Sequence, residues 1–159
     1  MKEQTMKKQR PGGYLIAKIH QISNRIFTKK LKEYEITDIN PAQGRILFAL
    51  WRKDGISINK LAKETSLSKS TLTPMLDRLE NIGHLKRKPS KKDRRKILIY
   101  LTEKNKKLQD KYVEVSIEMT KLFYNGFTLK EIDEFESYLQ KILENLKPYD
   151  SSKNKWIIA

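Results

Sequence analysis

Hydrophobic positions recur every three or four residues along much of this chain, which is the spacing of one face of an α-helix. The first stripe predicts a helix from Tyr14 to about Tyr34, and a second predicts a long helix from Thr102 to about Gly126. A third stripe predicts a last helix from Thr128 to Pro148, where the proline ends it. The pattern therefore predicts a mainly α-helical protein.

Three shorter helices are predicted between the long ones by their capping residues. Asn40 is the N-cap of a helix that begins at Pro41, and Gln43 completes a capping box. Serine caps predict two further helices, from Ser57 to about Glu64 and from Ser68 to about Asn81. Two short helices separated by a tight turn are typical of a helix-turn-helix.

The hydrophobic period changes after the helix-turn-helix. Residues 84–102 alternate between apolar and polar at both ends, and their polar centre contains Pro89 and Ser90. This alternation predicts a β-hairpin with a basic tip. Eight basic side chains accompany the single acid Asp93, namely Lys86, Arg87, Lys88, Lys91, Lys92, Arg94, Arg95 and Lys96.

These elements predict four segments. Residues 1–40 are a basic arm, mobile through residue 13, and a dimerisation helix; residues 41–102 are a winged helix-turn-helix DNA-binding domain. Residues 103–148 are C-terminal dimerisation helices, and residues 149–159 are a tail. A winged helix of about 60 residues cannot cover the stripes of three further helices, so we expect a homodimer. Burial within a monomeric bundle is the alternative.

The charge distribution indicates the partner. The chain has 34 Lys and Arg against 19 Asp and Glu, a net charge of +15, and residues 41–102 carry 15 basic and 5 acidic side chains. Positive charge concentrated on a helix-turn-helix and its hairpin favours double-stranded DNA as the partner, although a basic run can also be a solvated loop. Phosphate contacts would supply salt-dependent affinity, while sequence choice would come from the second helix.

The candidate DNA-binding side chains lie on the second helix of the helix-turn-helix and on the hairpin. Small hydroxyl groups fit close against base edges, and a long arginine reaches a guanine or a phosphate. The candidates are Ser68, Lys69, Ser70, Thr71, Thr73, Pro74, Arg78, Arg87, Lys88, Lys91, Lys92, Asp93, Arg94 and Arg95.

Pro74 is unusual because a proline inside a helix costs ~3 kcal/mol. We weigh two interpretations equally. In the first, its ring contacts a thymine methyl group, and the kink sets the angle at which Ser70 and Thr71 approach the bases. In the second, the helix simply bends, and the hydroxyl of Ser70 or Thr71 binds the freed carbonyl.

Two stretches resemble the multiple-antibiotic-resistance regulator (MarR) family. DRRKILIYLT, from Asp93 to Thr102, is similar to that family's wing, and SKSTLTPMLDRLENIGHLKR is similar to its recognition helix. TLTPML is especially similar to the branch of organic-hydroperoxide repressors. The resemblance implies a winged-helix homodimer with intertwined first and last helices, which binds a pseudo-palindromic operator and usually represses transcription. It also implies that Arg95 enters a narrow minor groove, oriented by Asp93.

Composition narrows the functions. The chain has no cysteine, which excludes disulfides and the thiol switch of the peroxide-sensing branch, and its two histidines, His20 and His84, lie far apart. We therefore expect no metal and no cofactor. No stretch approaches ~18 apolar residues, so we expect a cytoplasmic protein without a membrane partner. An enzyme is not expected, because clustered histidines and a phosphate-binding glycine loop are also missing. The alternative is a non-specific architectural nucleic-acid-binding protein.

The resemblance further implies an effector, a small aromatic anion bound between the dimer helices and the winged helix. Lys18, His20 and Tyr112 are candidate ligand-binding residues. Their ordinary roles would be a solvated charge, a surface or interface residue and core packing. Trp51 is expected in the core.

Overall fold

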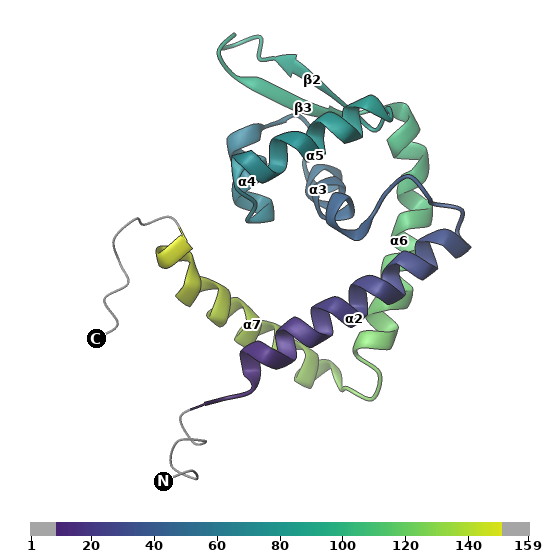
Figure 1. The fold of residues 1–159 in the computed structure, drawn as a ribbon, viewed down its shortest axis with the longest axis vertical. Coiled ribbons are helices and arrows are strands. Elements are labelled where there is room, and N and C mark those ends of the chain that lie inside the picture. The colour runs from purple at the N-terminus through teal and green to yellow at the C-terminus, as the bar shows by residue number, and fades with distance from the viewer. Residues whose placement is uncertain (1–8, 151–159) are drawn as a thin grey trace. The chain divides into compact units, whose positions relative to one another are not determined.

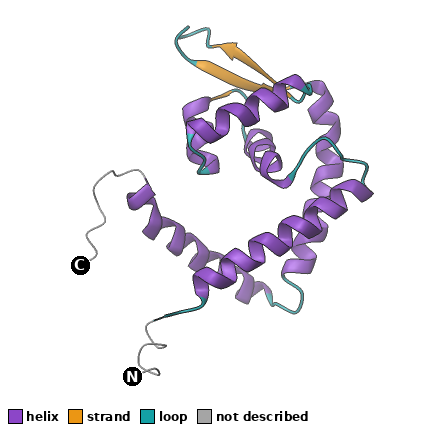
Figure 2. Cartoon of the chain, viewed as in Figure 1, coloured by secondary structure: helices purple, strands orange, loops and turns teal. Residues whose placement is uncertain are grey.

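The computed structural model describes residues 9–150, which form six helices and three strands (Figures 1 and 2). The elements are α2 (Gly12–Glu33), α3 (Pro41–Arg52), β1 (Ile56–Ser57), α4 (Ile58–Thr65), α5 (Lys69–Asn81), β2 (Leu85–Pro89), β3 (Ile97–Leu101), α6 (Glu103–Phe123) and α7 (Leu129–Asp150). The predicted mainly α winged helix-turn-helix is confirmed. Residues 1–8 of the predicted arm and residues 151–159 of the predicted tail lie outside the described residues.

Two predicted boundaries were wrong. Helix α2 begins at Gly12 rather than Tyr14, because the carbonyl of Pro11 already accepts a hydrogen bond from the N–H of Leu15 at 2.8 Å. Helix α7 continues past Pro148 to Asp150. Proline lacks its own N–H donor and crowds the carbonyl four residues earlier, but the donors of the residues after it stay available to extend the last turn.

The capping residues act as the sequence predicts. Asn40 accepts a hydrogen bond from the N–H of Gln43 at 2.8 Å, and the Gln43 side chain accepts one from the N–H of Asn40 at 3.0 Å. Ser57 caps α4 and Ser68 caps α5 through the N–H groups three residues later. Each cap satisfies a backbone donor that the first helical turn leaves unpaired.

The sheet has one strand more than predicted. Its order is β1-β3-β2, and both strand pairs are antiparallel, with Ile56 opposite Ile99 and Leu85 opposite Leu101. Strand β1 has two residues, which is too short to show a period of two, so only its pairing with β3 reveals it. The hairpin of β2 and β3 projects beside α5 as the wing (Figure 1).

The core lies under the helix-turn-helix and the sheet. Leucine and isoleucine side chains from α3, α4, α5 and the strands fill it, and Tyr112 of α6 enters from the side. Gly44 permits this entry, because a Cβ atom at that position would lie 1.6 Å from the Tyr112 hydroxyl oxygen. The Tyr112 ring also packs edge-on against Phe27 and Trp51, with centroid distances of 5.4 and 4.9 Å. Trp51 therefore packs against the core, as predicted.

Chain contacts divide the protein into two compact units at Met119 and Thr120, within α6. The first unit contains the winged helix and α2. There, Lys30 of α2 and Tyr34, which directly follows α2, both bind the Glu118 carboxylate, at 2.6 and 2.5 Å. In the second unit, Thr128 and Glu131 form a capping box at the start of α7. Within residues 9–150, no helix has the length and apolar character needed to cross a membrane.

Candidate nucleic-acid interface

Helix α5 buries one stripe of leucines and exposes most of its polar side chains. Leu72, Leu76 and Leu79 are fully buried. All seven residues predicted to bind DNA from this helix and its N-cap are solvent-exposed, namely Ser68, Lys69, Ser70, Thr71, Thr73, Pro74 and Arg78. A helix held by one leucine stripe thus presents hydroxyl and basic groups on a free surface, which is the form in which a helix enters a major groove.

Hydroxyl groups at the start of α5 bond among themselves. The Ser68 hydroxyl lies 3.0 Å from that of Ser70 and 2.9 Å from that of Thr71, and the Thr73 hydroxyl donates to the carbonyl of Lys69 at 2.8 Å. The second interpretation of Pro74 required a Ser70 or Thr71 hydroxyl on the Ser70 carbonyl. Both hydroxyls are instead directed toward Ser68. Pro74 is exposed on the same side, where its ring is free to contact a ligand.

At the tip of the wing, a short turn presents Arg95. The N–H of Ser90 donates to the carbonyl of Lys96 at 2.7 Å, which closes the loop. Asp93 accepts hydrogen bonds from the Arg95 N–H at 3.1 Å and from Arg95 Nε at 3.2 Å. The backbone bond and then the side-chain bond lower the pKa of Asp93, so this carboxylate stays ionised. The Arg95 side chain is 92% exposed, so its guanidinium group still faces solvent.

The wing tip and α5 border one groove. Its lining includes Lys69 and Thr73 of α5, together with Arg95 and Lys96 beside the wing strand β3. Lys60 and Lys63 of α4 line the same groove, where Glu64 is the acidic side chain. Residues from three separate elements therefore form one positively charged surface. Lys88, Lys91, Lys92 and Arg94 are exposed on the same hairpin.

Arg87 is the predicted DNA-binding residue of the wing that binds two acids of α5. Its Nη2 lies 2.6 Å from Asp77 Oδ1, and its Nε lies 3.1 Å from Glu80 Oε2. The hydrogen bond to Glu80 is the main cause of a raised pKa for the Arg87 guanidinium. Arg87 therefore faces α5, while its neighbours Lys86 and Lys88 are exposed.

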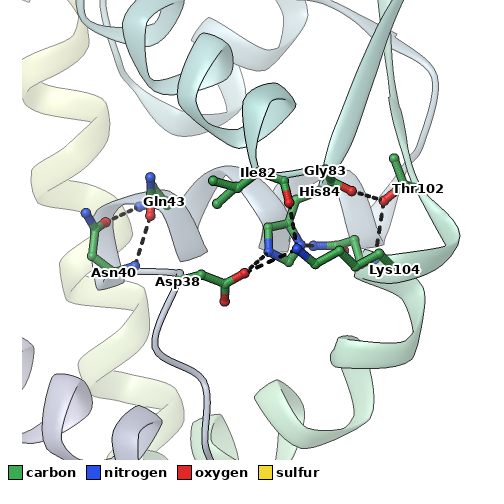
Figure 3. A network of polar contacts seen from close by, with 9 residues as sticks. Asp38, Asn40, Gln43, Ile82, Gly83, His84, Thr102 and Lys104 are labelled. Carbon is green, nitrogen blue, oxygen red and sulfur yellow. Dashed lines mark hydrogen bonds and ion pairs between the residues drawn. The ribbon is translucent and has the colours of Figure 1, made fainter.

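A buried polar network that the sequence did not suggest lies behind the wing (Figure 3). His84 is 1% exposed and lies 2.7 Å from Asp38 Oδ2 through Nε2 and 3.2 Å from Asn105 Nδ2 through Nδ1. Trp51 Nε1 donates to Asn105 Oδ1 at 2.7 Å, which leaves the Asn105 amide nitrogen to donate to His84. His84 Nδ1 is then an acceptor, and Nε2 donates to Asp38.

The network joins the α2–α3 connection to the base of the wing. Partial burial acts to raise the pKa of Asp38, but the hydrogen bond from His84 and the charge of Lys104 outweigh it and lower that pKa. Lys104 Nζ also binds the carbonyl of Ile82 at 2.6 Å, and Thr102 binds the carbonyl of Gly83 (Figure 3). These residues follow no periodic pattern in the sequence. The only feature that could have indicated the network is that polar residues lie between two structural elements.

The three predicted effector residues do not converge within one chain. Tyr112 is buried against Phe27 of α2. His20 lies seven residues before Phe27 and Lys18 nine, which is ~10 and ~13 Å along the helix axis. His20 binds Asn24, and Lys18 lies over the ring of Tyr14, on the exposed part of α2. Among residues 9–150 no group of three or more His, Asp or Glu side chains is placed to hold a metal ion.

The helix-turn-helix, the basic hairpin and the exposed face of α5 together define a winged-helix DNA-binding fold. Comparison with known proteins gives the family. The MarR family model matches residues 39–97. The organic hydroperoxide resistance transcriptional regulator of Bacillus subtilis (strain 168) is 34% identical over 125 residues, which cover 78% of this chain and 84% of that protein. The chain belongs to the MarR family of transcriptional regulators.

Other relatives support the same family assignment. The HTH-type transcriptional regulator MgrA of Staphylococcus aureus is 26% identical over 133 residues, covering 83% of this chain and 85% of that protein. A mutant MarR from E. coli, solved in complex with operator DNA, superposes with a TM-score of 0.74 at 28% identity, covering 84% of this chain and 94% of that one. Reduced AbfR bound to DNA gives a TM-score of 0.74 at 26% identity, covering 94% and 99%.

Proposed function

We propose that the chain is a sequence-specific regulator that binds a pseudo-palindromic operator in double-stranded DNA as a homodimer, and that it represses transcription in the cytoplasm. The observation that carries this proposal is the single groove that Lys69 and Thr73 of α5 share with Arg95 of the wing. Helix α5 and Arg95 lie on adjacent parts of one basic surface. This arrangement would let α5 enter a major groove while the arginine enters the minor groove beside it. The DNA-bound structures of two relatives support the same partner.

The homodimer is supported by apolar side chains that one chain leaves exposed. On α2 these recur at Leu15, Ile19, Ile22 and Ile26. On α7 they recur at Tyr138, Ile142, Leu146 and Tyr149. Helical stripes of this size are normally buried against a partner. A two-fold dimer would place two α5 helices about one DNA turn apart, ~34 Å, and so would read an inverted repeat.

An effector belongs to this proposal only as a ligand of the dimer. The separation of Lys18, His20 and Tyr112 within one chain does not support a site built from these three residues.

The test is a comparison of two duplexes at fixed salt. One is the duplex most enriched by the protein from a random pool, and the other is a shuffled duplex of the same composition. A sequence-specific regulator should prefer the enriched duplex by about 10³-fold or more. Arg95→Gln should reduce this preference, whereas Lys53→Gln, an exposed charge on neither α5 nor the wing, should leave it unchanged. Equal affinity for both duplexes would favour the architectural alternative.

A further inference from the structure

The contact between the wing and α5 is built around one guanidinium group. Arg87 of β2 binds Asp77 through Nη2 at 2.6 Å and Glu80 through Nε at 3.1 Å. Its Nη2 also lies 3.4 Å from Glu80 Oε1. The two acids stand three residues apart on α5 and so occupy neighbouring positions on one helix face. The Arg87 side chain is 24% exposed, less than either acid.

Glu80 makes a second bond to the same strand. Its Oε2 accepts from the backbone N–H of Arg87 at 3.1 Å. Strand β2 is an edge strand, because the sheet order is β1-β3-β2, and an edge strand has backbone donors without a strand partner. One carboxylate from α5 therefore holds both the backbone and the side chain of a wing residue. This is a fixed joint between two elements that the proposed function assigns to adjacent grooves.

Strand alternation explains why Arg87 differs from its neighbours. Successive side chains of a strand point to opposite faces, so Lys86 and Lys88 share one face and Arg87 takes the other. Lys88 Nζ lies 5.9 Å from the ring centroid of Tyr100, on the face away from α5. A basic run that is continuous in sequence is thus divided into two exposed lysines and one arginine engaged with acids.

We infer that Arg87 is a positioning residue, which sets the angle between α5 and the wing through Glu80 and Asp77, and that it does not bind a DNA phosphate. This inference rests on the proposed function. Loss of the joint lets the wing move relative to α5, so that both cannot engage one operator at low cost. Binding to duplexes of unrelated sequence depends on surface charge and does not need that fixed angle.

Glu80→Ala separates positioning from charge because the two effects have opposite signs. The substitution removes a negative charge beside the DNA-binding surface, so charge alone would strengthen binding to every duplex. Loss of the joint instead weakens binding to the enriched duplex, by about tenfold or more, while the shuffled duplex is bound equally or slightly more tightly. Glu80→Gln, which keeps one acceptor oxygen, should give an intermediate loss.

The salt dependence of binding tests Arg87 itself. Each phosphate contact contributes about 0.9 to the slope of log affinity against log salt, so losing one per subunit lowers a dimer's slope by about 1.8. Arg87→Gln should weaken binding to the enriched duplex and leave the slope unchanged. Lys88→Gln is the matched control on the same strand. It should weaken binding to both duplexes and lower the slope.

A double substitution that exchanges the two charges is the control for misfolding. Arg87→Glu combined with Glu80→Arg keeps the net charge and restores an ion pair, and it should recover part of the lost preference. The inference is overturned if Glu80→Ala binds the enriched duplex as tightly as the parent, or if Arg87→Gln lowers the slope as Lys88→Gln does. If the parent protein itself shows no preference between the duplexes, the proposed function fails, and that result is distinct from either outcome.

Discussion

Two parts of this chain differ in whether their apolar side chains are buried. In the winged helix, Leu47, Leu61 and Leu76 are completely buried within one subunit. Helix α7 has no buried residue at all, and its Leu146 is 60% exposed. The winged helix therefore has a core of its own, whereas α7 has an apolar stripe that needs a second surface. Stability should come from within the subunit in the first part and from association in the second.

The largest effect should follow from placing a charge on the stripe of α7. Ile142→Glu puts a carboxylate where we expect a dry contact between subunits, and the cost of burying it should abolish the dimer at micromolar concentration. Sedimentation velocity should then give a mass near the 18.8 kDa of one chain. Lys141→Gln changes the charge by the same amount on an exposed neighbour and should leave the dimer intact. A dimer that survives Ile142→Glu would place the interface elsewhere.

Within the winged helix, truncating a core residue should lower stability without changing association. Leu76→Ala removes a fully buried side chain from α5, which typically costs about 2–5 kcal/mol of unfolding free energy. Urea unfolding would measure the loss. Thr73→Ala, on the exposed side of the same helix, should stay within about 0.5 kcal/mol. Equal losses in the two variants would contradict the burial pattern of α5.

A smaller effect is expected where α3 begins. Asn40→Ala removes the acceptor for the Gln43 N–H and should cost about 1 kcal/mol. Asn59→Ala, in the first turn of α4, makes the same substitution where asparagine is not the cap, and should cost less. Thermal unfolding of both variants checks the difference. If they melt alike, the capping box contributes little to the self-contained core.

The smallest effect concerns the hydrogen bond between Tyr34, which directly follows α2, and Glu118 of α6. A hydrogen bond to Glu118 is the main cause that raises the pKa of Tyr34 to about 12. Because the folded pKa is raised, the stabilising contribution is complete below pH 10 and is lost as the pH rises toward 12. Glu118→Gln should move the Tyr34 titration back toward 10, as followed by NMR of ring-labelled tyrosine. Glu114→Gln removes only a weaker charge effect and should change the titration little.

Several features of the fold were predictable because their causes are local. Asn40 and Ser68 cap helices through bonds that span three residues, and a sequence displays that spacing directly. The leucine stripe of α5 and the exposed face opposite it follow from the helical period. Strand β1 and the end of α7 were missed, the first because two residues carry no period and the second because Pro148 limits a helix less in its last turn.

The candidate site divides in the same way. The sequence was enough to predict the exposed candidates for DNA binding, which include Lys69, Thr73 and Arg95. Arg87 was nominated on the same grounds, but its strand partner and the acids of α5 decide which way it points. Sequence spacing gave no reason to connect His84 with Asp38, which stands 46 residues away.

By itself, the sequence determined the helices, their caps, the basic hairpin and the excess positive charge near it, because each depends on residues close together in the chain. Only the tertiary structure decided which basic side chains are free and which are held. That choice depends on contacts between elements, since a guanidinium group pairs with the carboxylate that the fold brings within about 3 Å of it.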